Sequence, residues 1–527
     1  MLGGTKVKRV LGELPLTAEL DWAIRGRRAP MDGFKLEELK AALPEWCRQV
    51  AASPKPRQKG KKVLVFATLH YWISHAILLS LALDGLGHEP TLAYLPYSTW
   101  KKSVSKFDLR RREAYVRSVF KPAQGLIGIQ SFSIVPQPSR LPGPIENAVE
   151  QVAEMDTQYT LQVEEVDKTS DLFRLRLMRN RAAAAAALDW LQKQRPDVVI
   201  LPNGLILEFG AVFHVARHLE IPVVSYEFGE QRDRIWLSRN TPVMLQETDA
   251  LWSAKKNEAF AELQRNQVET LFTTRKEAGL FQNFYRQWQN LPAQGAEAVR
   301  SKLALDDRPV VLLAANVIGD SLTLGRAAFT GDMSTWLRRT MDYFAGHNDV
   351  QFVLRVHPGE RNLEGPSVAD LVDQQFANLP THMRVVGAED SVNTYDLVAL
   401  ADLGLVYTTT VGLEMAMNGL PVIVAGETHY RGKGFTTDPS NWEEYFSALD
   451  RDLANLQSAK LDQRQIDMAW HYAYRFFFDY PQPYPWHLLH FWKDAESTPL
   501  NQIFSEAGQA KYARTFDHLL GQPFEWD

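Results

Sequence analysis

Residues 402–434 constrain the fold of this chain more than any other stretch of its sequence. An apolar run, Leu403–Tyr407, ends in three threonines, and a second apolar run follows Pro421. Between the two runs, Val411–Asn418 has helical composition, and Gly419 is placed to end such a helix. The pattern predicts a strand, a short helix and a second strand, which is the repeating unit of a parallel sheet.

The same unit predicts an anion site. The amide groups and the dipole of a helix that begins just after a strand favour a negative charge, most often a phosphate. Thr409, Thr410 and Gly412 lie where such a group would sit, and Glu414, one turn into the helix, is placed to meet ribose hydroxyls. Together these residues predict a pocket for a nucleotide-activated sugar.

Two further strand ends in the same half of the chain carry polar residues. The run 350–360 ends in His357 and Pro358, and the proline keeps His357 extended, so that its ring is expected to project from the sheet edge and donate to a phosphate. The run 308–316 ends in a turn. There Asn316, Asp320 and Ser321 are either ligands or plain turn residues.

A loop with two glycines and two cations follows the second apolar run of residues 402–434. Tyr430, Arg431 and Lys433 are expected to close over a pyrophosphate or a sugar carboxylate. The alternative is a solvated basic loop.

Strand-like apolar runs alternate with helical segments twice along the chain. This predicts an α/β fold of two Rossmann-like lobes, with a cleft at the carboxyl ends of both sheets and a C-terminal helical segment. Four domains are predicted. Residues 1–60 form a helical extension and linker, and residues 61–300 form an acceptor lobe that includes a helical connection from Thr248. Residues 301–455 form a nucleotide-sugar lobe, and residues 456–527 form C-terminal helices and an aromatic tail that packs back on the body.

Carboxylates follow a strand of the first lobe, the run 221–227. Glu227 and Glu230 are candidates for a general base, which requires a carboxylate of raised pKa. They are equally suited to orienting a substrate or capping a helix. His70 and His75, after the first strand, are further candidates.

Composition excludes several classes of protein. A formal net charge of −5 argues against a dedicated nucleic-acid binder, and the single cysteine, Cys47, rules out an internal disulfide and a cysteine-rich metal site. The first residues lack the apolar core of a secretion signal, and no apolar run has transmembrane length, so we expect a cytoplasmic location. No dinucleotide fingerprint, P-loop, serine elbow, HExxH motif or metal-binding acidic pair is present.

The segments RVHPGE, YTTTVGLEMAMNGLPVIVAG and HYRGKGFT resemble those of bacterial capsule polysaccharide biosynthesis proteins, which include transferases of 3-deoxy-manno-octulosonic acid (Kdo). The resemblance covers residues 308–440. It implies the two-lobed GT-B arrangement, with a nucleotide-activated sugar in the second lobe. It also implies that three elements of the family, His-Pro, Ser/Thr-x-x-Gly-x-Glu and Tyr-x-Gly-x-Gly, correspond here to His357–Pro358, Thr409–Glu414 and Tyr430–Gly434. Arg355–Val356 replace the Lys-Pro that usually precedes the His-Pro pair.

We therefore predict a metal-independent glycosyltransferase without a cofactor, which uses a CMP- or UDP-linked sugar and a glycan or lipid-linked acceptor. The alternatives are a nucleotide-sugar 2-epimerase, a polyol-phosphate transferase and a non-catalytic component of polysaccharide assembly.

The aromatic tail, residues 475–492, has two interpretations. It packs across the body of the protein, or it contacts the inner membrane face or a lipid acceptor, because aromatic rings favour such interfaces.

Overall fold

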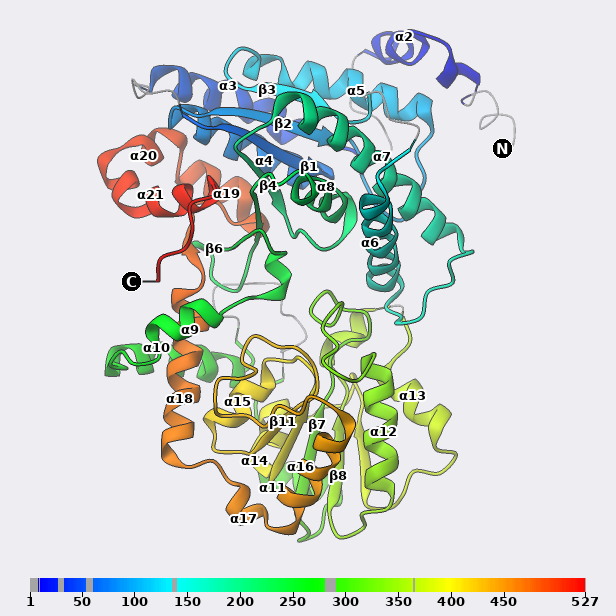
Figure 1. Cartoon of the computed structure of the whole chain (residues 1–527), viewed down its shortest axis with the longest axis vertical. Helices are drawn as coiled ribbons and strands as arrows, with labels where there is room; N and C mark the ends of the chain where they lie inside the picture. Colours follow the sequence, from blue (N-terminus) through cyan, green and yellow to red (C-terminus); the bar gives the residue numbers. More distant parts are fainter. Residues whose placement is uncertain are drawn as a thin grey trace. The chain divides into compact units, whose positions relative to one another are not determined.

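The computed structural model describes residues 8, 10–26, 33–53, 60–134, 140–279, 291–363 and 365–526. The chain forms two compact units (Figure 1). Unit 1 comprises residues 1–156, 167–244 and 482–524, and unit 2 comprises residues 157–166, 245–481 and 525–527. Most of the linker predicted after Ser53 lies outside the described residues.

Unit 1 contains a seven-stranded sheet in the order β12-β6-β5-β4-β1-β2-β3. Strands β1 to β5 are parallel, β6 is antiparallel to β5, and β12 is antiparallel to β6. The strands are β1 (Lys62–Thr68), β2 (Glu89–Leu95), β3 (Gly128–Ser131), β4 (Val198–Pro202), β5 (Val223–Glu227), β6 (Arg234–Arg239) and β12 (Gln482–Pro483). The central strands are continuous apolar runs because helices cover both faces of the sheet.

The helices of unit 1 include some that are far apart in sequence. They are α2 (Thr17–Ile24), α3 (Glu37–Ala52), α4 (His70–Gly85), α5 (Lys106–Phe120), α6 (Gly143–Leu161, whose last residues belong to unit 2), α7 (Asp171–Gln194), α8 (Leu207–His218), α19 (Phe491–Ser497), α20 (Leu500–Phe504) and α21 (Glu506–Leu519). Ser170 caps α7 by accepting a hydrogen bond from the Phe173 amide, and Arg195, with a φ of 43°, ends it before Pro196.

Unit 2 has a five-stranded parallel sheet in the order β11-β10-β7-β8-β9. The strands are β7 (Val310–Ala314), β8 (Gln351–Arg355), β9 (Met383–Val386), β10 (Leu403–Val406) and β11 (Val422–Val424). The helices are α9 (Asp249–Lys255), α10 (Glu262–Lys276), α11 (Ala296–Lys302), α12 (Met333–Ala345), α13 (Val368–Gln375), α14 (Thr394–Leu400), α15 (Val411–Met417), α16 (Trp442–Ala454), α17 (Leu456–Ala459) and α18 (Gln463–Tyr474).

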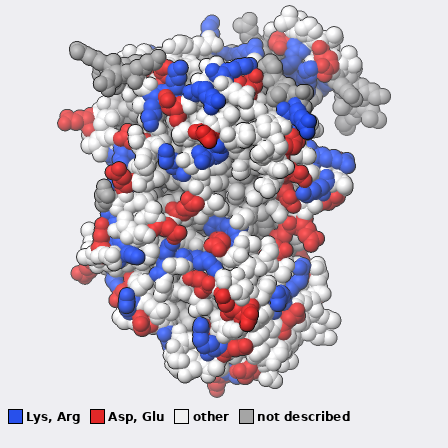
Figure 2. All heavy atoms as spheres, viewed as in Figure 1, with Lys and Arg blue, Asp and Glu red and all other residues white. Residues whose placement is uncertain are grey.

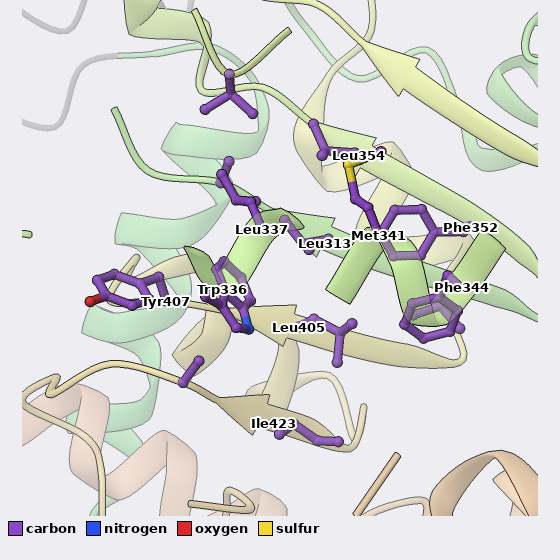
Figure 3. Close-up of a cluster of buried hydrophobic side chains, with 14 of the residues drawn as sticks. Leu313, Trp336, Leu337, Met341, Phe344, Phe352, Leu354, Leu405, Tyr407 and Ile423 are labelled. Carbon is purple, nitrogen blue, oxygen red and sulfur yellow. The ribbon is translucent and has the colours of Figure 1, made fainter. Parts of the chain in front are cut away.

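The core of unit 2 lies between its sheet and α12, α13 and α16. Trp336 of α12 is fully buried against the sheet (Figure 3), and its indole N–H donates to the Tyr445 hydroxyl at 3.0 Å. Asp332 caps α12 by accepting from the Thr335 amide. These contacts fix the first turn of α12 beside the carboxyl end of β7.

The predicted fold class, two Rossmann-like α/β lobes with a C-terminal helical segment, is confirmed for each unit by itself. The predicted limits of the lobes differ from the two units in several places. Residues 157–166, assigned to the first lobe, belong to unit 2. Residues 245–300, assigned to the first lobe, cluster with unit 2 because α10 packs on α18. The C-terminal segment is divided, with residues 456–481 in unit 2 and residues 482–524 in unit 1.

Residues 70–72 form the first turn of α4, because Leu69 makes the turn after β1. Helix α3 continues through Pro44, because Leu39, Leu43 and Trp46 bury one face of the helix on both sides of the proline.

The aromatic tail packs inside the protein. Phe476, Tyr480, Tyr484, Trp486 and Phe491 are each at most 5% exposed. The membrane-contact interpretation of these rings is therefore wrong, since a buried ring presents no surface to a lipid.

Candidate functional site

The carboxyl edge of the unit 2 sheet has a topological switch point between β7 and β10. The chain proceeds from β7 through β8 to β9 on one side, and from β10 to β11 on the other. Open α/β sheets bind their ligands at such a point, because the connections diverge there and leave a crevice. Asn316, after β7, and Thr408, after β10, meet across it, and the Asn316 side-chain oxygen accepts from the Thr408 amide at 3.1 Å.

Tyr430 supports the backbone of the threonines that follow β10 and of the start of α15. This fully buried side chain donates from its hydroxyl to the Thr409 carbonyl at 2.6 Å. A Cβ atom at Gly412 would lie only 2.3 Å from the Tyr430 hydroxyl oxygen, so this position requires glycine. Tyr430 therefore holds the backbone at Thr409 in place. Thr410, at the start of α15, is half-buried.

Glu414 is buried in an ion pair. Its carboxylate accepts from the guanidinium of Arg275, on α10, at 2.6 Å, and both side chains are at least 95% buried. This buried ion pair gives Glu414 a structural role that joins α15 to α10.

His357 lies at the carboxyl end of β8, as predicted. Its Nδ1 accepts a hydrogen bond from the Gly359 amide at 3.1 Å. The neutral ring therefore carries its proton on Nε2, which is a donor. Pro358 begins a short 3-10 helix, Pro358–Asn362, and the half-buried His357 ring is held at its start. This geometry suits donation to a phosphate oxygen.

The turn after β7 is built against residues 157–166. Gly319 has a φ of 67°, and a Cβ atom there would lie 2.7 Å from the Gln158 carbonyl oxygen. The Asp320 carbonyl accepts from the Thr323 amide at 2.8 Å, and the Ser321 hydroxyl lies 3.3 Å from the Asp320 carboxylate. Burial raises the pKa of Asp320. The contacts are those of a tight turn, the alternative that the sequence left open.

The two predicted loop cations are engaged within unit 2. Arg431 donates to the backbone carbonyls of Val424, at 2.9 Å, and Pro439. Lys433 is buried and forms an ion pair with Asp249. Both cations therefore stabilise the loop that follows β11, and neither extends over the sheet edge.

Two residues at this edge were not predicted. Arg326 is 2% exposed, donates to the Glu427 carbonyl at 3.4 Å and to the Gln246 side chain at 3.3 Å, and burial lowers its pKa to about 10. His429 stacks on Phe476 with ring centroids 3.6 Å apart, and burial holds its pKa well below its usual value. No spacing in the sequence marks Arg326, because the Glu427 carbonyl and the Gln246 side chain that it contacts lie 101 and 80 residues away.

Unit 1 has its own switch point, between β1 and β4, where the backbone is strained. Leu69, after β1, has a φ of 65° and a ψ of 139°, and Asn203, after β4, has a φ of 60°. Such conformations are costly for residues other than glycine, and they cluster at functional sites. The Asn203 side-chain oxygen accepts from the amides of Leu205 and Ile206 at 3.0 and 3.1 Å, which fixes its orientation.

Glu227 ends β5, beside this switch point. Burial raises its pKa to about 7, although hydrogen bonds from the Phe228 amide and the Asn203 side chain favour the charged form. A carboxylate that titrates near neutral pH is suited to general base catalysis. Among the first-lobe candidates, Glu227 has the properties that the role requires.

The other first-lobe candidates have different surroundings. Glu230 lies partly buried in the loop after β5. His70 begins α4, half-buried, with its ring edge against Phe34, and burial lowers its pKa. His75 is fully buried between the hydroxyls of Tyr226, at 3.1 Å, and Tyr484, at 3.3 Å, and burial lowers its pKa to about 3. This enclosed position gives His75 a structural role in the core of unit 1.

The pKa of Glu227 predicts a pH-dependent effect of Glu227→Gln on stability. Glutamine mimics the protonated carboxyl. Between pH 4.5 and about 7 the folded chain keeps a proton that the unfolded chain has lost, so the carboxyl's contribution to stability falls as pH rises through this window. The variant should match the wild type near pH 4 and exceed it by up to about 3 kcal/mol at pH 8. Urea unfolding at both pH values measures the difference.

A matched control is Glu269→Gln, at an exposed position on α10. It should change stability little at either pH. A stability difference for Glu227→Gln that stays constant from pH 4 to pH 8 would show that Glu227 has an ordinary pKa.

The described residues contain no group of three or more His, Cys, Asp or Glu side chains placed to hold a metal ion. None of the helices in that part of the chain has the length and apolarity needed to cross a bilayer.

The two units define an α/β protein of the Rossmann-like class, with a candidate ligand site at the carboxyl edge of the unit 2 sheet. Residues 272–473, less than half of the chain, match the family model described as capsule polysaccharide biosynthesis protein. This match confirms the resemblance that was predicted from the sequence. No curated protein matches the chain.

Solved structures resemble the chain at low identity. KpsC of Thermosulfurimonas dismutans, described as a beta Kdo 2,4 transferase, has 15% identity and a TM-score of 0.36, over 55% of this chain and 81% of that one. A putative UDP-N-acetylglucosamine 2-epimerase from Listeria monocytogenes has 12% identity and a TM-score of 0.26, over 78% and 91%.

Proposed function

We propose that the chain is a glycosyltransferase of capsule or surface polysaccharide biosynthesis, in which unit 2 binds a nucleotide-activated sugar and unit 1 binds a glycan or lipid-linked acceptor. The observation that carries the proposal is the unit 2 switch point, where Asn316, the threonines after β10 and the oriented His357 follow three neighbouring strands. The family of residues 272–473 supports the same class of reaction.

The donor's phosphate would be held by hydrogen bonds. The Nε2–H group of His357 and the Thr410 hydroxyl are donors at the carboxyl edge, where charge develops on the departing phosphate oxygen. Donors held in place before the reaction stabilise this charge without reorganising. In the proposed mechanism they take the part that a divalent cation plays in other transferases.

Glu227 would take the proton of the acceptor hydroxyl. The acceptor oxygen then forms a bond to the anomeric carbon, and the bond from that carbon to the phosphate oxygen breaks, releasing the nucleotide. A base with a pKa of about 7 is largely ionised just above neutral pH and still accepts a proton readily.

We expect one of CMP, UDP, GDP, CDP and dTDP to raise the melting temperature of the chain. A nucleotide at one hundred times its Kd stabilises the folded state by about 2.7 kcal/mol. CMP or UDP is the expected ligand.

The variant His357→Asn should weaken the binding of this nucleotide at least about tenfold. Asparagine can still accept from the Gly359 amide, but the Nε2–H donor to a charged phosphate is lost.

The matched control for the binding test is His347→Asn, in the connection between α12 and β8 at the opposite edge of the sheet, which should bind the nucleotide like the wild type. The proposed site is contradicted if no nucleotide raises the melting temperature of the chain, or if the His357→Asn variant binds with wild-type affinity.

Once a donor is identified, Glu227→Gln should bind it normally but transfer its sugar at least a hundredfold more slowly. EDTA should leave the wild-type rate unchanged. Nucleotide binding without any transfer would favour the non-catalytic assembly component.

A further inference from the structure

Residues 157–166, which we call the strap, pack on the carboxyl edge of the unit 2 sheet. They comprise the last residues of α6 and the turn that follows it, and they belong to unit 2, although the residues before and after them belong to unit 1. The Gln158 side chain donates to the Glu164 carbonyl at 2.7 Å, and the Val163 amide donates to the Gln158 carbonyl at 3.2 Å. These internal hydrogen bonds make the strap a single compact piece.

The strap contacts two of the connections that form the proposed donor site. Gly319, in the turn after β7, lies so close to it that a Cβ atom there would be 2.7 Å from the Gln158 carbonyl oxygen. Gly365 follows His357 by eight residues, and its amide donates to the Gln162 side chain at 3.3 Å. The strap therefore lies against the connections that follow β7 and β8, the strands whose ends carry the predicted donor-binding residues.

The carboxylate of Glu164 fixes the strap to the start of α12. Its two oxygens accept from the amides of Met333 and Ser334 at 2.8 and 2.9 Å. Asp332 accepts from the Thr335 amide, so the first three amides of α12 all donate to carboxylates. Because amides at a helix start favour an anion, Glu164 is held as firmly as an external anion would be. The strap thus brings a negative charge to the edge where the donor's phosphate is expected.

The position of the strap on this edge is costly for the residues that form it. Gln162 has a φ of 56°, in the left-handed region that suits glycine. Burial raises the pKa of Glu164, and the neighbouring Asp332 carboxylate adds to this effect, although hydrogen bonds from Ser334 and Met333 favour the charged form. A contact that carries strain and like-charge repulsion is more readily given up than a relaxed one.

The surface charge of the protein does not favour phosphate binding by itself. Figure 2 shows acidic and basic side chains interspersed over the visible part of the described surface, and the whole chain has a formal net charge of −5. A phosphate must therefore be recognised by a few local groups rather than by a broad basic surface. A carboxylate held at the same edge opposes that recognition, because it repels the phosphate's charge.

We propose that the strap is an autoinhibitory element, which must leave the carboxyl edge of unit 2 before a nucleotide-activated sugar binds, and that Glu164 is the residue that holds it closed. This role rests on the proposed function, since it presupposes a donor in unit 2. While the strap is closed, only the open fraction of the molecules binds the donor, and the apparent affinity falls by that fraction. Weakening the Glu164 contact therefore raises the affinity.

Two variants should open the strap by independent routes. Glu164→Gln keeps the size of the side chain but removes the charge that the α12 amides hold. Gly365→Ala leaves Glu164 unchanged, but the added Cβ atom would lie 2.6 Å from the Gln162 Cβ and 2.7 Å from the Leu161 carbonyl oxygen, which forces the strap outward. In isothermal titration calorimetry, each variant should bind CMP or UDP, whichever binds the wild type, at least about tenfold more tightly.

Each variant has a matched control. Glu165→Gln alters the exposed neighbour of Glu164. Gly346→Ala adds a Cβ atom at the end of α12, where its nearest neighbour, the Tyr343 carbonyl oxygen, would lie at an ordinary distance of 3.6 Å. Both controls should bind the nucleotide like the wild type.

Hydrogen exchange tests the opening of the strap without any nucleotide. The Gly365 amide donates to Gln162 of the strap and not to Glu164. If the strap leaves as one piece, Glu164→Gln should speed the exchange of the Gly365 amide as well as that of the Met333 and Ser334 amides. If Glu164 is an ordinary helix cap on a fixed wall, only the two amides of α12 should exchange faster.

The outcomes separate the role of the strap from the proposed function. If the wild type binds a nucleotide but neither variant binds it more tightly, the strap is a fixed wall, and the proposed function stands. A gain in Glu164→Gln alone would reflect the lost charge rather than a displaced strap, and it also overturns autoinhibition, as does unchanged exchange of the Gly365 amide. Binding by the two variants but not by the wild type would support both proposals. If none of these chains binds any nucleotide, both are wrong.

Discussion

Arg275→Leu is expected to lower the free energy of unfolding of unit 2 by about 3–5 kcal/mol, because it leaves the Glu414 carboxylate buried without its cation. The loss should be visible in urea unfolding. Hydrogen exchange should locate it to α10 and α15, since the ion pair joins these two helices.

A second variant distinguishes the ion pair from the loss of a large side chain. Arg275→Leu combined with Glu414→Leu removes both charges, and an apolar pair is often as stable as the buried ion pair that it replaces. The double variant should recover most of the loss. Arg308→Leu, which removes an exposed pair with Asp306, should leave unfolding nearly unchanged. A double variant less stable than Arg275→Leu would show that Glu414 does not depend on the pair.

Arg176→Met should destabilise unit 1 by a similar amount, about 3–5 kcal/mol. Arg176, on α7, contacts the carboxylates of Asp156 and Glu208 at 3.0 Å each, and all three side chains are at least 99% buried. Methionine fills much of the volume but removes the guanidinium that pairs with both carboxylates. The effect should appear in urea unfolding followed by hydrogen exchange of α7 and α8.

The pH dependence of Arg176→Met tests the same explanation. Its deficit should shrink as pH falls, since protonation neutralises the Asp156 carboxylate, whose pKa burial already raises in the wild type. Arg181→Met, on the same helix but 47% exposed and paired with Glu146, should cost less than about 1 kcal/mol. A deficit that does not change with pH would mean that lost packing, rather than the orphaned charges, destabilises the variant.

The sequence predicted the central strands of both sheets because the burial of such a strand is visible in its own few residues. A strand of a parallel sheet that is covered on both faces is a continuous apolar run, as in β1, β4 and β7. The edge strand β3, Gly128–Ser131, carries no such run and was missed. Its place in the sheet depends on pairing with β2, which a local pattern does not contain.

The candidate site was predicted in part for the same reason. His357 and Asn316 follow strands whose ends the sequence marks, and the sheet brings them to one edge. Side-chain partners were not predictable. Glu414 and Arg431 were expected at the ligand, but Arg275, from α10, and the Val424 carbonyl engage them. Nothing near Glu414 in the sequence indicates a partner 139 residues away.

By itself the sequence determined the alternation of strands and helices, the two Rossmann-like lobes and the positions of the strand ends, because backbone preference and apolar periodicity act over a few residues. Only the tertiary structure decided which charged groups are paired and buried, how Glu227 comes to have a pKa of about 7, and that Glu164 lies at the start of α12. Those properties depend on desolvation and on contacts between residues distant in the chain, and both arise only when the helices and sheets are packed.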